Sequence, residues 1–175
     1  MQKLRYPVVI LLFMAVVFSF TYKPAPKVAW MSFKEMQEAY AIEPRPILID
    51  MYTSWCGWCK VMDKKTYSNK NIVAYINQNF YAVKFNAESQ ETISFSGENY
   101  AYNKKEKINE LAKKLAGYDL GFPSTIFLSK PGALPAVISG FLKPGELEAP
   151  LKYFGTKANE KQSFIDFEKS LTKQW

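Results

Sequence analysis

The sequence has no histidine and only two cysteines among its 175 residues. A closed structural zinc site takes about four ligands, mostly cysteine and histidine, so these two thiols cannot complete one, and a copper-delivery site lacks ligands for the same reason. Disulfide-scaffold proteins carry many cysteines at wide spacings, whereas this pair would close only a small loop. With 48% apolar residues the chain can bury a core without such cross-links. We therefore expect a single domain with no bound metal and no disulfide scaffold.

The apolar run near the N-terminus is too short for an ordinary transmembrane helix. Residues 8–20 are apolar apart from Ser19, and they follow Lys3 and Arg5. A spanning helix needs about 20 apolar residues, while a basic start and a shorter apolar run are typical of a secretory signal. Because no small-x-small cleavage triplet follows, we expect residues 1–22 to be a signal peptide or an uncleaved membrane anchor, with residues 23–31 as a linker. Both interpretations place the protein in the periplasm or cell envelope; a buried N-terminal core element is the alternative.

The positive charge is moderate and scattered. Without residues 1–20 the chain keeps 21 basic and 16 acidic residues, and its lysines occur in short separate groups. Scattered charge predicts a solvated basic surface and no nucleic-acid partner.

Helix and strand patterns alternate along the rest of the chain. Strand patterns cover residues 46–54 and 80–88, a hairpin centred on Gly97 covers 93–102, and two strands around a Pro-Gly turn cover 124–139. Helix patterns cover 32–42, 59–67, 68–80, 105–118, 143–155 and 163–175. This order predicts an α/β fold with a central mixed β-sheet flanked by helices.

Both cysteines lie in the segment SWCGWC, directly after the strand pattern. Cys56 would begin a helix, whose free N–H groups and dipole stabilise a thiolate and lower a thiol pKa. Cys59, one turn later, is expected to be more enclosed and to stay protonated until needed. Residues three apart on a helix have Cα atoms about 5 Å apart, which suits a disulfide. We expect a redox-active Cys56–Cys59 pair and no other cofactor; two inert buried cysteines are the alternative.

Four neighbours of the pair are candidate site residues. Gly57 would keep the approach to Cys56 open, and Trp55 and Trp58 would face substrate or else pack in the core. Asp50 follows the apolar residues PILI and would face the interior, where an acid can carry a proton. The alternative is that Asp50 is a strand-end residue bonded to nearby backbone.

The segment DMYTSWCGWCK resembles the active site of the thioredoxin superfamily, most of all exported bacterial thioredoxin-like proteins with a CGWC centre. Asp50 and Lys84 fall where that family keeps a buried acid and its lysine partner. GFPSTIFL resembles the family's cis-proline strand, which would place Phe122 and Pro123 beside the disulfide. SGFLKPGEL resembles its glycine-containing turn, with Gly140 bordering the substrate groove. The resemblance covers residues 32–155 and implies a thioredoxin-like fold.

The chain departs from this pattern in three places. Gly-Trp stands between the cysteines, residues 87–107 form a predicted hairpin insertion before the third helix, and residues 156–175 form a C-terminal helical extension. The first two leave the redox potential and the direction of electron flow open.

The resemblance implies an exported thiol–disulfide oxidoreductase that reduces or isomerises protein disulfides. Cys56 would attack a protein or peptide disulfide, and Cys59, deprotonated with help from Asp50, would release the client. A membrane-bound electron donor and a monomeric state are expected. The alternative is a binding or chaperone-like module whose disulfide switches affinity without turnover; the set of Asp50, Lys84 and Pro123 favours the enzyme.

Overall fold

The computed structural model describes residues 26–118 and 120–175. The predicted signal peptide or anchor at residues 1–22 and the start of the predicted linker lie outside the described residues. Among the helices that are described, none combines the length and the apolar character needed to span a bilayer.

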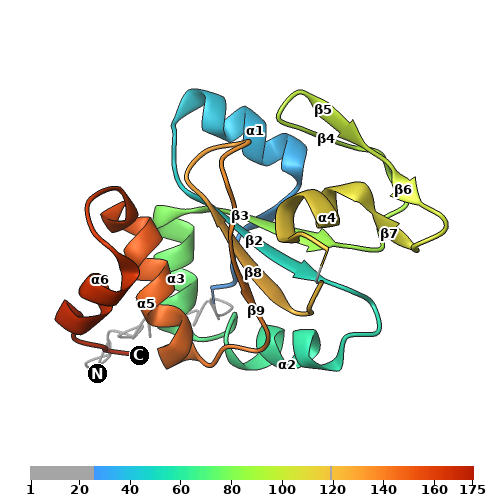
Figure 1. The fold of residues 1–175 in the computed structure, drawn as a ribbon. Helices are drawn as coiled ribbons and strands as arrows, with labels where there is room; N and C mark the ends of the chain where they lie inside the picture. The colour runs from blue at the N-terminus through green and yellow to red at the C-terminus, as the bar shows by residue number, and fades with distance from the viewer. Residues whose placement is uncertain (1–25, 119) are drawn as a thin grey trace, which may run out of the picture.

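A mixed five-stranded sheet forms the centre of the fold, in the order β1-β3-β2-β8-β9 (Figure 1). β3 runs parallel to β1 and β2, whereas β8 runs antiparallel to β2 and β9. The strands are β1 (Trp30–Met31), β2 (Ile47–Tyr52), β3 (Tyr81–Asn86), β4 (Ile93–Phe95), β5 (Glu98–Tyr100), β6 (Tyr102–Asn103), β7 (Ile108–Asn109), β8 (Ser124–Leu128) and β9 (Ala136–Ser139). The helices are α1 (Phe33–Ile42), α2 (Gly57–Lys65), α3 (Lys70–Asn79), α4 (Glu110–Ala116), α5 (Pro144–Gly155) and α6 (Phe164–Ser170), with a short 3-10 helix, η1 (Ala158–Glu160). The predicted α/β fold with a mixed central sheet is confirmed.

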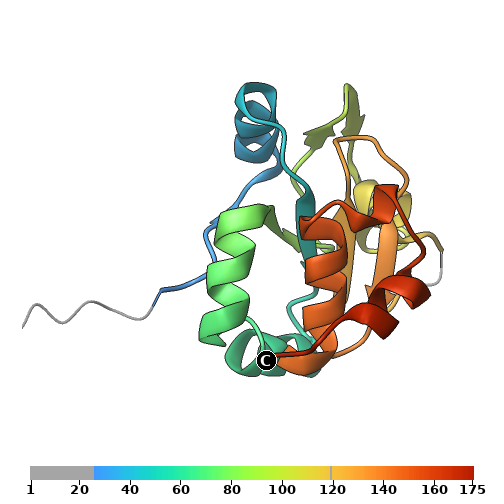
Figure 2. The ribbon, with the colours of Figure 1, turned by 90° about the vertical axis from the view of Figure 1, so that its left-hand side faces the viewer.

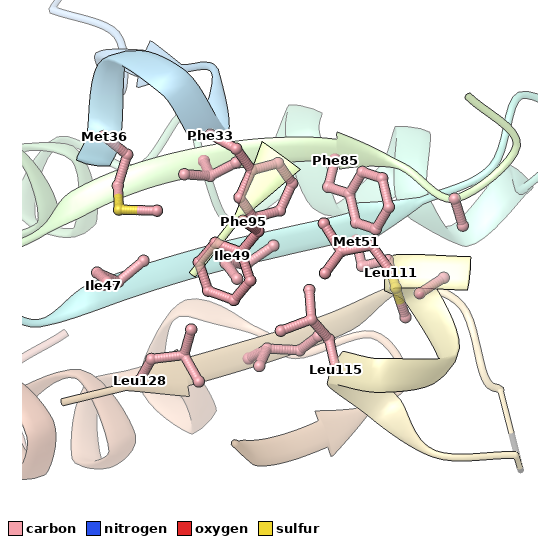
Figure 3. Close-up of a cluster of buried hydrophobic side chains, with 14 of the residues drawn as sticks. Phe33, Met36, Ile47, Ile49, Met51, Phe85, Phe95, Leu111, Leu115 and Leu128 are labelled. Atoms are coloured by element: carbon pink, nitrogen blue, oxygen red, sulfur yellow. The ribbon is translucent and has the colours of Figure 1, made fainter. Parts of the chain in front are cut away.

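The side chains of β2 alternate between the two faces of the sheet, and different helices cover each face. Ile47, Ile49 and Met51 point to one face and pack under α1 and α4 (Figure 3). Leu48 points to the other face, in a cluster with residues of α2, α3 and α5, and α3 and α5 lie in front of the sheet in Figure 2. Because side chains alternate, Asp50 lies on the same face as Leu48, the face that α2 covers.

One strand lies where a linker was predicted. Trp30 and Met31 form β1 and pair with Ala82 and Val83 of β3. The prediction of a linker over 23–31 is therefore wrong at its C-terminal end. A two-residue strand is too short to produce an alternating pattern, so the sequence carried no signal for it.

Two small antiparallel pairs connect β3 to α4. β4 and β5 pair across the turn at Ser96 and Gly97, whose φ values of 52° and 82° suit a two-residue hairpin turn. β6 and β7 form a second pair that the sequence did not indicate. That the 87–107 segment is an insertion relative to related proteins stays a prediction.

Two helices are shorter than their sequence patterns. α4 begins at Glu110, because Ile108 and Asn109 pair in β7 and the Asn109 side chain then caps the helix. α6 ends at Ser170, and the chain turns back toward α5. There the carboxylate of Glu148 accepts hydrogen bonds from the backbone N–H groups of Gln174 and Trp175 at 2.8–2.9 Å.

Candidate active site

α2 follows β2 along the chain (Figure 1), and the two cysteines lie at the beginning of α2. Cys56 is the N-cap residue of α2, and Cys59 lies in its first turn. Their sulfurs are joined in a disulfide, and their Cα atoms are 5.3 Å apart. The backbone N–H of Cys59 donates to the Cys56 sulfur at 3.0 Å. A helix end thus directs an N–H donor at the sulfur of Cys56, which would stabilise negative charge there after reduction.

The two cysteines do not differ in burial. Cys56 is 4% exposed and Cys59 is 5% exposed. The expectation of an exposed first cysteine and an enclosed second one is therefore wrong for the disulfide form. The bond holds the two side chains together, so each covers part of the other. What distinguishes the sulfurs is the helix N-cap position of Cys56.

The residues beside the cysteines are open to solvent. Trp55 is 68% exposed and Trp58 is 61% exposed, so the alternative that they pack in the core is wrong. Among the described residues, a Cβ atom added at Gly57 would meet no atom within 4 Å apart from those of its chain neighbours and the backbone of its own helix. The backbone at Gly57 is therefore accessible to another molecule.

The loop before β8 contacts this surface. The Phe122–Pro123 peptide bond is cis, and the Phe122 ring packs edge-on against Trp55 with centroids 5.9 Å apart. Gly140 has a φ of +102°, a conformation that favours glycine. Its backbone N–H donates to the Pro123 carbonyl at 2.7 Å. The two loops indicated by the sequence resemblance are thus joined to each other, and one of them reaches Trp55.

Phe141 is a contact that sequence reasoning missed. Its ring stacks on Trp58 with centroids 5.6 Å apart and an interplanar angle of 29°. The only signal was its position next to Gly140 in the glycine-containing turn.

Asp50 and Lys84 are direct partners in the register of β2 and β3. The Lys84 Nζ donates to Asp50 Oδ2 at 2.8 Å, while Asp50 Oδ1 is buried and has no hydrogen-bond partner among the residues that the structure describes. Asp50 is 2% exposed, so the alternative of a strand-end residue bonded to nearby backbone is wrong. Burial raises the pKa of Asp50 to about 6, and the attraction of Lys84 opposes that rise.

Asp63 is a second carboxylate on the same lysine, and sequence reasoning missed it. Lys84 Nζ donates to Asp63 Oδ1 as well as to Asp50. Burial alone would lower the pKa of Lys84, but the two carboxylates raise it above its usual value. Asp63 follows Cys59 by four residues on α2, and residues at this spacing share a helix face. The four-residue spacing between Cys59 and Asp63 could have indicated Asp63 as a site residue.

Three aromatic rings surround the Lys84 ammonium. The ring centroids of Trp30, Tyr52 and Tyr67 lie 5.1, 5.3 and 5.8 Å from Nζ, within cation–π range. A cavity of about 400 Å³, lined in part by Trp30, Asp63, Tyr67 and Lys84, opens beside this group. The lysine that holds Asp50 therefore has its own access to solvent.

Glu88 holds the loop that leads to Cys56. Its carboxylate accepts hydrogen bonds from the backbone N–H of Ser54 at 2.8 Å and from the Ser54 hydroxyl at 2.7 Å. These bonds lower the pKa of Glu88, with a smaller contribution from Trp55. Ser54 and Glu88 are 34 residues apart, so no local pattern could have predicted the contact. Over the described ranges, the structure contains no group of three or more histidine, cysteine, aspartate or glutamate residues placed to hold a metal ion.

Comparison with known proteins matches residues 33–155 to the family described as "Thioredoxin-like domain". The "Thiol:disulfide interchange protein DsbD" of Pectobacterium atrosepticum is 26% identical over 122 residues, which cover 69% of this chain and 18% of that relative. The chain thus spans less than a fifth of the length of this relative.

Solved structures show the same fold at low identity. A thioredoxin-fold protein from Helicobacter pylori is 20% identical with a TM-score of 0.55, and the match covers 72% of this chain and 79% of that one. A protein described as "DsbH Oxidoreductase" is 18% identical with a TM-score of 0.52, covering 77% and 90% of the two chains.

Proposed function

This chain belongs to the thioredoxin-like domain family, and from that premise we propose that it is a thiol–disulfide oxidoreductase that reduces or isomerises protein disulfides. The observation that carries the proposal is Cys56 at the N-cap of α2, disulfide-bonded to Cys59 and accepting its backbone N–H. Helix ends of this kind favour the thiolate, which is the form that attacks disulfides.

In the first step, the Cys56 thiolate of the reduced protein attacks one sulfur of a client disulfide. The client S–S bond breaks as the bond to Cys56 forms, and the other client sulfur leaves as a thiolate that takes up a proton. The exposed rings of Trp55 and Trp58 would contact the client, while Phe122, Pro123 and Gly140 form the adjoining loops. The open backbone at Gly57 leaves room for the client chain.

In the second step, Cys59 loses its proton and attacks Cys56. The mixed disulfide breaks, the Cys56–Cys59 bond forms, and the client leaves reduced, so two electrons pass from the protein to the client. Asp50, on the face that α2 covers, would accept the Cys59 proton. Its pKa of about 6 suits uptake and release of a proton near neutral pH. Lys84 holds Asp50 in place and has access to solvent.

Another reaction must reduce the Cys56–Cys59 disulfide again. We propose a membrane-bound electron donor and exported protein clients, met in the periplasm or cell envelope by a monomeric domain. The relative from Pectobacterium is described as a thiol:disulfide interchange protein, which supports an exchange partner for this chain too. The apolar run at residues 8–20 supports export.

Insulin reduction by dithiothreitol tests the proposal. The protein should accelerate precipitation of the insulin B chain catalytically, whereas Cys56→Ser should not exceed the uncatalysed rate. Circular dichroism of both forms would establish that the variant is folded. Equal rates for the parental protein and Cys56→Ser would show that the Cys56–Cys59 pair does not turn over, and the proposal would be wrong.

A further inference from the structure

Four exposed lysines, which we call the lysine surface, lie where α2 meets α3 and in the segment before β1. Lys64 and Lys65 are in the last turn of α2, and Lys70 is the first residue of α3. Ser68, in the turn between these helices, donates its hydroxyl to the Lys64 carbonyl at 2.6 Å and lines one cavity with Lys27. The fold therefore gathers lysines from distant parts of the sequence: Lys27, Lys64, Lys65 and Lys70.

The charge of the lysine surface is not compensated by its surroundings. None of the four lysines forms an ion pair with another residue that the structure describes. Asp63 is the only acidic residue between positions 51 and 87, and its carboxylate already accepts a hydrogen bond from Lys84. The other exposed residues of α3 carry no charge. An anionic partner would therefore meet no repulsion on α3.

The chain passes directly from its apolar N-terminal run to the lysine surface. Residues 8–20 contain no charged side chain, and no acidic residue precedes Glu35. Only residues 21–26 separate the run from Lys27, and a chain of that length extends over at most about 25 Å. The Lys27 carbonyl accepts a hydrogen bond from the Asn77 side chain at 2.9 Å, which fixes this segment against α3. An apolar run buried in a bilayer would thus hold the lysine surface close to the lipid headgroups.

We propose that the lysine surface binds the phosphate groups of anionic phospholipids and docks the domain on a membrane. The inference goes beyond the oxidoreductase function and does not depend on it. A lysine near an anionic bilayer strengthens attachment about five-fold, and salt screens this attraction. Apolar insertion and a basic surface are two separate signals, and stable membrane attachment takes two.

Docking through the lysine surface would leave the disulfide free for exchange. Cys56 is the N-cap of α2, whereas Lys64 and Lys65 are in its last turn. The nine residues of α2 extend about 13 Å along the helix axis. The disulfide would stay near the bilayer without being covered by lipid, within reach of a membrane-bound electron donor.

Lysine acetylation of the full chain tests the proposal. The protein is reconstituted in vesicles of phosphatidylcholine, with or without phosphatidylglycerol, and treated briefly with a water-soluble acetylating reagent. Mass spectrometry then gives the rate at each lysine. The lysine surface should react about five-fold more slowly on vesicles that contain phosphatidylglycerol. The difference should disappear at about 1 M salt, where charges are screened beyond about 3 Å. The exposed lysines of the β6–β7 loop are the internal control and should react equally on both: Lys104, Lys105 and Lys107.

Two variants with the same loss of charge separate docking at this surface from general attraction. The first replaces the three lysines of α2 and α3, and the second replaces the three control lysines. They are Lys64→Gln/Lys65→Gln/Lys70→Gln and Lys104→Gln/Lys105→Gln/Lys107→Gln. In the first variant Lys27 should react as fast as it does on neutral vesicles, whereas in the second it should stay protected. Both variants should reduce insulin in solution at the parental rate.

The parental protein alone can overturn the proposal, whether or not the variants fold. Equal rates at the lysine surface on both kinds of vesicle would do so, as would equal protection of the control lysines, which would show unspecific coverage. Protection in detergent micelles that rises with protein concentration would assign the surface to a second copy of this chain and would also overturn the proposal. Failure of insulin reduction with lipid-dependent protection intact would contradict the oxidoreductase and leave the docking standing.

Discussion

Replacement of Asp50 by asparagine should stabilise the protein at neutral pH while slowing the release of clients. The carboxyl group of Asp50 is buried, and within the described part of the chain one of its oxygens has no hydrogen-bond partner. Ionisation of a group in such a place is unfavourable, and asparagine keeps the shape without the charge. The same substitution removes the proposed acceptor for the Cys59 proton.

The pKa of Asp50 sets the size of the effect. Burial raises it from 3.8 to about 6. A shift of about 2 units corresponds to a cost of about 3 kcal/mol for the ionised form. The pKa of about 6 already includes the opposing attraction of Lys84, and Lys84 keeps Asp63 as a counter-charge when Asp50 is replaced. We expect a net stabilisation of about 1–3 kcal/mol at pH values well above the folded-state pKa.

The sign of the pH dependence follows from linkage. A raised pKa means that the folded state holds the proton more tightly than the unfolded chain does, so the cost of ionisation is absent below pH 3.8. The cost grows as the pH rises from 3.8 to about 6 and is complete above that value. Urea denaturation of the disulfide forms should therefore show a large difference between Asp50→Asn and the parental protein at about pH 8, and little difference at about pH 4. Asp63→Asn removes the more exposed carboxylate on the same lysine; because Asp63 is the smallest cause of the raised pKa of Asp50, this variant should change the pH dependence of stability far less.

Stopped-flow kinetics would complete this test. Asp50→Asn should form the mixed disulfide with a client at nearly the parental rate and resolve it more slowly. A stability difference that is the same at both pH values would show that ionisation of Asp50 is not costly in the folded state. Resolution at the parental rate would show that Cys59 loses its proton to some other group.

Three further substitutions test neighbours of the site and the C-terminal segment. Asp63→Asn should leave Lys84 paired with Asp50 alone and so lower the pKa of Asp50. The pH midpoint of the resolution step, measured by stopped flow, should then move to lower pH. An unchanged midpoint would contradict the shared pairing. Glu88→Ala removes the acceptor that holds Ser54 and should slow attack on insulin disulfides several-fold at a stability cost of about 1 kcal/mol, whereas the exposed Glu91→Ala should change neither. Glu148→Gln should cost about 2 kcal/mol in urea melts near neutral pH and leave insulin turnover unchanged. Hydrogen bonds from Lys152 and from the backbone N–H groups of Gln174 and Trp175 lower the pKa of Glu148 despite its burial. The contribution of Glu148 to folding stability is therefore present above pH 4.5 and is lost as the pH falls below that value. Equal stability effects of the substitution in acid and at neutral pH would refute this pH dependence.

Much of the site could be predicted because it depends on strand and helix patterns in neighbouring parts of the sequence. The strand pattern before the cysteines and the helix pattern after them place Cys56 at a helix start, as the structure shows. The burial of Asp50 followed from its position at the end of an apolar strand. Its pairing with Lys84 was implied by resemblance alone, since the parallel register of β2 and β3 cannot be read from either strand.

The residues that sequence reasoning missed depend on contacts between distant segments. Glu88 reaches Ser54, and Phe141 reaches Trp58, across loops that no periodic pattern connects. Trp30 was assigned to a linker, although it lies over the ammonium of Lys84 once β1 joins the sheet. The burial of Cys56 was also missed, because the disulfide covers part of it.

The central claim is that Cys56 exchanges disulfides with client proteins and Cys59 completes the exchange. The most direct measurement uses Cys59→Ala, mixed with a protein disulfide substrate and analysed by mass spectrometry after acid quenching. We predict a stable adduct through Cys56, formed in proportion to the protein and absent in Cys56→Ser. If Cys59→Ala forms no adduct, or releases its client as fast as the parental protein does, the assignment of the two cysteines is wrong.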